Sequence, residues 1–78
     1  MKAKIIETLN GLCVHIPSSD RKLVAEIADK IDDLESCNVV ELRFLPKSVN
    51  ESIIIVSDSL LTAKEDILTI LSEYHDKD

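Results

Sequence analysis

The chain of 78 residues predicts an α+β fold, a two-layer sandwich with both helices on one face of a four-stranded, mainly antiparallel sheet. Four short segments are rich in β-branched residues, and two longer segments carry apolar residues at helical spacing. Their order is ββαββα. Each helical pattern is apolar on one side only, so both helices can bury that side against the same sheet. The length predicts a single domain, residues 1-78, because a second core needs roughly 50 more residues.

The first two strands are expected to form a hairpin around Asn10-Gly11. Asn-Gly favours a two-residue type I′ turn, in which both central residues take positive φ. Such a loop pairs Leu9 with Leu12 and separates two sides of the hairpin. The side expected to face the core carries Ile5, Glu7, Leu9, Leu12, Val14 and Ile16. The other side carries Ile6, Thr8, Cys13 and His15.

The first helix is expected to start after Pro17, where Ser18-Ser19-Asp20 supplies side-chain oxygens for an N-cap. Its apolar stripe has a period of 3.6 residues and consists of Leu23, Val24, Ile27, Ala28, Ile31 and Leu34. The last helix is expected to begin at Thr62, where Thr62 and Glu65 have the spacing of a capping box. Its buried face is expected to comprise Ala63, Ile67, Ile70, Leu71 and Tyr74, with Leu68 at the margin.

The third strand is expected over residues 39–45, where apolar and polar side chains alternate. Val40, Leu42 and Phe44 would then face the core, and Glu41 and Arg43 would face away. The fourth strand, over residues 53–56, is a continuous β-branched run. Such a run predicts either a strand covered on both faces or a strand with an exposed apolar side.

The sheet face turned away from the helices is therefore expected to be unusually apolar. Its expected members are Ile6, Cys13, His15, Val39, Glu41, Arg43, Ile54 and Val56. Three interpretations remain open: scattered exposed aliphatic side chains, an interface with a protein partner or a second copy, or a different strand pairing.

The formal charge of -6 is unevenly distributed along the chain. Residues 1–17 sum to +1, whereas residues 18–37 and 59–78 each sum to -3. Acidic helices favour solubility, or they attract a basic partner. The scarcity of aromatic residues disfavours nucleic-acid binding by stacking, and the acidic charge disfavours attraction to phosphate unless a local basic patch is present.

No catalytic or cofactor-binding constellation is expected. Cys13 and His15 could form a thiolate-imidazole pair, but no further group is predicted to converge on them. The ligand spacing of Cys13, His15, Cys37 and His75 fits no zinc site, and one glycine cannot build a phosphate-binding loop. Two reduced thiols, no signal peptide and no apolar run of membrane-spanning length favour a cytoplasmic protein.

Three fragments resemble known families. The segment from Asn10 to Ser18 resembles the strand-turn-strand of swapped-hairpin regulators and antitoxins of the AbrB and MazE type, which implies an intertwined DNA-binding or toxin-binding dimer. The layout from residue 19 onward, with Lys64-Glu65-Asp66, is similar to the DinI modulators of the RecA recombinase, which implies binding through the last helix. Residues 47–53 resemble the region before the regulatory serine of histidine phosphocarriers. The phosphoryl-accepting histidine of that family would be Cys13 here, which implies loss of carrier activity. Each match is short, so no family is adopted.

The expected function is that of a small acidic module without catalytic activity or cofactors, which binds a protein partner or a second copy of itself. The partner-binding residues expected are Ile6, His15, Val39, Ile54, Val56, Glu65, Asp66, Glu73 and Asp76. The alternatives are a DNA-binding regulator or antitoxin, and a DNA-mimicking modulator. The regulator would use the basic residues Lys2, Lys4, Arg21 and Lys22.

Overall fold

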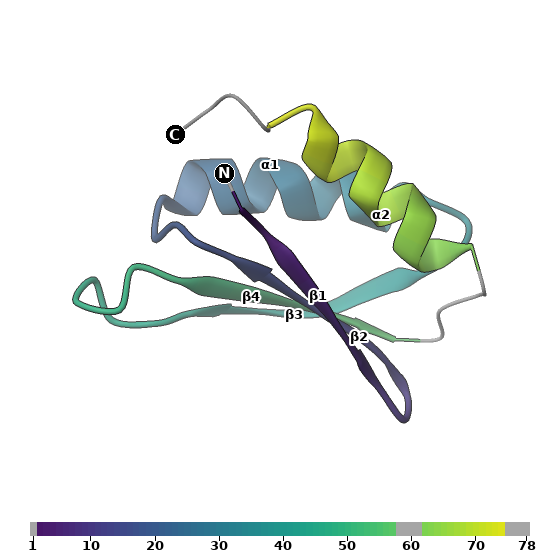
Figure 1. Cartoon of the computed structure of the whole chain (residues 1–78), viewed down its shortest axis with the longest axis horizontal. Coiled ribbons are helices and arrows are strands. Elements are labelled where there is room, and N and C mark those ends of the chain that lie inside the picture. The colour runs from purple at the N-terminus through teal and green to yellow at the C-terminus, as the bar shows by residue number, and fades with distance from the viewer. Residues whose placement is uncertain (1, 58–61, 75–78) are drawn as a thin grey trace.

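A computed structural model describes residues 2–57 and 62–74 and confirms the predicted fold class. The strands are β1 (Lys4–Thr8), β2 (Gly11–Ile16), β3 (Asn38–Phe44) and β4 (Ser52–Ser57), and the helices are α1 (Arg21–Asp32) and α2 (Ala63–Ser72). The strands form one antiparallel sheet in the order β1-β2-β4-β3. Both helices lie on the same side of it (Figure 1).

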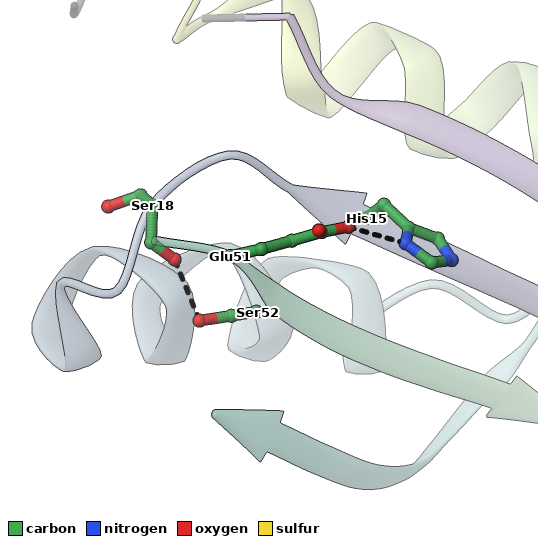
Figure 2. A network of polar contacts seen from close by, with 4 residues as sticks. All are labelled: His15, Ser18, Glu51 and Ser52. Carbon is green, nitrogen blue, oxygen red and sulfur yellow. Dashed lines mark hydrogen bonds and ion pairs between the residues drawn. The ribbon is translucent and has the colours of Figure 1, made fainter. Parts of the chain in front are cut away.

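The core fills the space between the helices and the sheet. The helix stripes pack there as expected, with Val24, Ile27, Ile31 and Ile67 fully buried and Leu23 and Leu34 half-buried at the rim. The sheet contributes Leu12, Val14, Ile16, Ile54 and Val56. Ser52 is the fully buried polar residue of this layer, and its Oγ donates a hydrogen bond to the carbonyl of Ser18 at 2.7 Å (Figure 2).

The predicted turn of the first hairpin is wrong by one residue. Thr8 pairs with Gly11, so the loop consists of Leu9 and Asn10, and Gly11 belongs to β2 without a positive φ. Leu9 is fully exposed rather than packed on Leu12. Gly11 is required by a close approach instead, because a Cβ there would lie 2.0 Å from the carbonyl oxygen of Val56. The predicted cross-strand pairs are also wrong, because Ile5 pairs with Val14 rather than Ile16 and Ile6 pairs with Cys13 rather than His15. Each partner moves by two residues along β2, so the predicted faces of the two strands are unchanged.

The predicted faces of β3 and β4 are partly wrong. The register of β3 against β4 shifts between Val39 and Glu41, which leaves Val40 as an extra residue in a β-bulge. Val39 therefore packs against the core and Val40 is 60% exposed. In β4, Ile54 and Val56 are buried under the helices, so Val39, Ile54 and Val56 do not belong to the outer face.

The two helix starts are formed differently. Of the three residues predicted to supply the N-cap of α1, Asp20 is the cap, and its Oδ1 accepts hydrogen bonds from the backbone N–H groups of Lys22 and Leu23 at 3.0 and 3.3 Å. The second helix begins after Thr62 as predicted, but the capping box is wrong. The Thr62 side chain makes no cap hydrogen bond, and the residue already has helical dihedral angles.

Candidate interaction face

The side of the sheet that the helices leave uncovered is here called the open face. It is defined by two rows of residues that the strand register aligns across all four strands. The first row consists of Ile6, Cys13, Ile55 and Glu41, and the second consists of Lys4, His15, Ile53 and Arg43. In Figure 1 the helices lie above the sheet and the open face is turned downward.

The centre of the open face is aliphatic. Ile6 is 50% exposed, and Cys13, Ile53 and Ile55 are half-buried by their neighbours in the sheet. Alternate side chains of β4, including Ile53 and Ile55, point to the open face. Of the two predictions made for the β-branched run, the strand with an exposed apolar side is therefore correct. Ile53 and Ile55 thus replace the predicted Ile54 and Val56. The run itself signalled an apolar outer face but could not say which residues form it.

Polar groups at the rim of the open face are paired. The Arg43 guanidinium donates a hydrogen bond from Nε to the carboxylate of Glu41, and this contact raises the pKa of Arg43. His15 Nδ1 lies 2.7 Å from Glu51 Oε1 (Figure 2). Because a carboxylate only accepts hydrogen bonds, Nδ1 carries the hydrogen in this contact. The rim therefore holds an Arg–Glu ion pair and a hydrogen-bonded His–Glu pair around an apolar centre.

A pocket of about 230 Å³ adjoins the His15 end of the open face. Its lining comprises Lys2, Lys4, His15, Pro17, Val49, Asn50 and Glu51. Asn50 has a φ of 53°, and its Oδ1 accepts hydrogen bonds from the backbone N–H and the hydroxyl of Ser19, which tie the β3–β4 loop to the start of α1. The pocket was not predicted, because it forms only when three distant segments meet.

The described residues assemble little that resembles a catalytic site. Cys13 and His15 lie on the same face in neighbouring rows, as predicted, but the resolved hydrogen bond of His15 goes to Glu51. Within the described residues, no group of three or more His, Cys, Asp or Glu side chains could hold a metal ion. Both cysteines are free thiols, Cys13 on the open face and Cys37 buried. Burial raises the pKa of the Cys37 thiol.

Three of the acidic residues expected to bind a partner, Glu65, Asp66 and Glu73, lie on the helix side, and two of them have internal contacts. Asp66 Oδ2 accepts a hydrogen bond from Ser36 Oγ at 2.9 Å, which joins α2 to the loop before β3. Glu73 lies 3.7 Å from Lys30 Nζ. Glu65 is exposed near the start of α2. Asp76 lies outside the described residues.

The four basic residues of the alternative prediction fall into two neighbouring groups. Lys2 and Lys4 line the pocket. Arg21 and Lys22 open α1, and the Arg21 guanidinium lies 4.5 Å from the centre of the Phe44 ring. The hydrogen bonds between Ser19 and Asn50 connect the two groups, so the four cations lie at the same end of the molecule.

No family model, no curated protein and no solved structure matches the chain. None of the helices described here is long and apolar enough to cross a membrane.

Proposed function

We propose that this protein is a non-enzymatic interaction module that binds a protein partner through the open face. The observation that carries the proposal is the aliphatic centre formed by Ile6, Ile53 and Ile55 on the side of the sheet opposite both helices. Side chains in such a position lose water contact only when another molecule covers them, and burying them stabilises a complex by roughly 25 cal/mol per Å² of apolar surface.

The distribution of charge also favours the open face over the acidic helices. Across the open face, Glu41 lies among the basic residues Lys4 and Arg43, so an approaching protein meets charges of both signs. On the helix side, Asp66 and Glu73 already contact Ser36 and Lys30.

A matched pair of substitutions tests the proposal. Ile6 and Leu68 are almost equally exposed, at 50% and 48%, but Ile6 lies on the open face and Leu68 on α2. Affinity capture from the native host, followed by mass spectrometry, compares the wild type with Ile6→Lys and Leu68→Lys. We expect Ile6→Lys to lose the captured protein, or the captured untagged copies of the chain, and Leu68→Lys to retain them. The reverse result would assign binding to the acidic helices.

DNA binding is the second candidate, favoured by the cluster of Lys2, Lys4, Arg21 and Lys22 at one end of the molecule. Neutralising phosphates with these residues releases counterions, so the affinity would fall steeply with salt. Titration against duplex DNA at two salt concentrations tests it. Binding at low salt that is lost in Lys4→Glu would support this candidate, and absence of binding at low salt would reject it.

A further inference from the structure

We propose that the occupant of the open face is a second copy of this chain, and that the two copies pack open face to open face about a two-fold axis perpendicular to the strands. This inference rests on the proposed function, because it names the partner of the same surface.

The two rows of the open face are complementary when the first row of one copy packs on the second row of the other copy. An axis that lies between the sheets and runs perpendicular to the strands places each strand over its own counterpart and the first row over the partner's second row. Ile55 then meets the partner's Ile53, and Glu41 meets the partner's Arg43. Symmetry makes each of these contacts twice. Packed sheets cross at about 30°, and this angle displaces β3 and β1 more than the central strands, within the reach of long side chains.

The other in-plane axis gives a poorer match. A two-fold axis parallel to the strands would lay β1 over the partner's β3, which places Lys4 against the partner's Arg43 and Ile6 against the partner's Glu41. The first contact joins like charges, and the second removes a carboxylate from water without a new partner. The perpendicular axis places Lys4 over the partner's Ile6, where the long Lys side chain can keep its ammonium group in water at the edge of the sheet. The charges of the rows therefore select the perpendicular axis.

The area of the open face suits a dimer of modest affinity. The Cα atoms extend over 33 × 23 × 18 Å. Figure 1 looks down the 18 Å axis with the 33 Å axis horizontal, and in this view the helices lie above the sheet. The side of the molecule that carries the open face measures 33 by 18 Å, so a face-to-face dimer can bury at most about 600 Å² in each copy, at the lower end of stable interfaces. We expect a reversible dimer with a dissociation constant in the micromolar range.

Face-to-face packing also keeps the acidic layers apart. The two sheets would lie about 10 Å from each other, with the helices on the outer surfaces of the dimer. The charge of -6 on each chain resides mainly on the helical segments, which are then separated by more than the screening length of about 8 Å at physiological salt. Self-association through the helices would instead bring like charges together.

A charge exchange between Glu41 and Arg43 is the sharpest test. Sedimentation equilibrium from low to high micromolar concentration measures the monomer–dimer constant. We expect Glu41→Arg and Arg43→Glu each to weaken the dimer about tenfold or more, because each places like charges in contact twice. The double variant Glu41→Arg/Arg43→Glu should return within a few-fold of the wild type. Leu68→Lys is the matched control on the opposite layer and should leave the constant unchanged.

A second pair of variants tests the same arrangement at an exposed position. Ile6 lies opposite the partner's Lys4, so Ile6→Lys should weaken the dimer and Ile6→Glu should be tolerated. Both substitutions are at an edge strand and half-exposed, so the monomer should fold in both. Circular dichroism and thermal unfolding of each variant verify this.

The outcomes separate the dimer from the proposed function. A wild type that stays monomeric at high micromolar concentration overturns the dimer, while loss of another captured protein by Ile6→Lys would still support the open face as a binding surface. A dimer that is indifferent to Ile6→Lys and Glu41→Arg overturns both proposals. A double variant that stays as weak as the single ones overturns the perpendicular axis.

Discussion

Gly11 lies where the backbones of β2 and β4 leave no room for a side chain. A Cβ at this position would lie 2.0 Å from the carbonyl oxygen of Val56 and 3.0 Å from the Cα of Ser57. Both atoms belong to the backbone of a paired strand, so they cannot move without breaking the ladder. We expect Gly11→Ala to lower the free energy of unfolding by about 3 kcal/mol, measured by urea denaturation.

The neighbouring Asn10 is the control for this prediction. It lies in the exposed turn without a positive φ, so Asn10→Ala should change the free energy of unfolding by less than about 0.5 kcal/mol. A larger cost for Asn10→Ala than for Gly11→Ala would indicate that Asn10 and Gly11 form the central residues of the hairpin turn in solution.

The buried thiol of Cys37 is expected to make the folded state less stable as the pH becomes alkaline. Burial is the main cause that raises the pKa of its thiol above the ordinary value of 9.0, and Asp66 and Asp32 add to it. The unfolded chain therefore loses this proton before the folded one. The contribution of the neutral thiol is complete below pH 9.0 and is lost as pH rises through the folded pKa.

The measurement is the midpoint of thermal unfolding on both sides of pH 9.0. We expect Cys37→Ala to be less stable than the wild type at neutral pH, because the buried sulfur is lost, but to lose less stability at alkaline pH. Equal slopes in the two proteins would contradict the assignment.

Among the elements, the two helices depend unequally on their first residues. Asp20 accepts two backbone hydrogen bonds at the start of α1, whereas Thr62 accepts none at the start of α2. Asp20→Ala should therefore cost about 1 kcal/mol of unfolding free energy, and Thr62→Ala should cost only a few tenths. Chemical denaturation of both variants measures the difference. Similar costs would show that Thr62 caps α2 in solution.

The elements show which parts of the fold the sequence can predict. The helices were predicted with their buried faces because a stripe of period 3.6 is a local signal that needs no partner. The faces of β3 were predicted in part, since Leu42 and Phe44 do pack on the core. The bulge at Val40 reverses the face of Val39, and nothing local in an alternating strand reveals an extra residue.

The candidate site was predicted to a similar extent. Ile6, Cys13, His15, Glu41 and Arg43 were correctly placed on the outer face, since the side-chain period of two fixes them within each strand. In β4 the β-branched run does not alternate, so the choice between Ile53 and Ile54 depends on the register with β2. The contact of His15 with Glu51 joins residues 36 positions apart, which no sequence spacing could indicate.

The helices cover one face of the sheet, and in the proposed dimer a second copy covers the other. Two adjacent residues of β4 allow the two faces to be compared. Ile54 is fully buried under the helices, and Ile55 is half-buried on the open face. We expect Ile54→Ala to cost about 3 kcal/mol of unfolding free energy at any protein concentration, because the cavity lies within the monomer.

Ile55→Ala should behave differently because its environment depends on assembly. At concentrations where the chain is monomeric, we expect a cost of about 1 kcal/mol, since part of the side chain is already in water. Above the dimer constant, the wild type gains stability from association and the variant gains less, so the cost should grow with concentration. Thermal unfolding of the wild type and both variants over the same range measures this. A cost for Ile55→Ala that stays constant with concentration would argue that the open face is solvated in the native protein, whereas growth of both costs in parallel would place the association elsewhere.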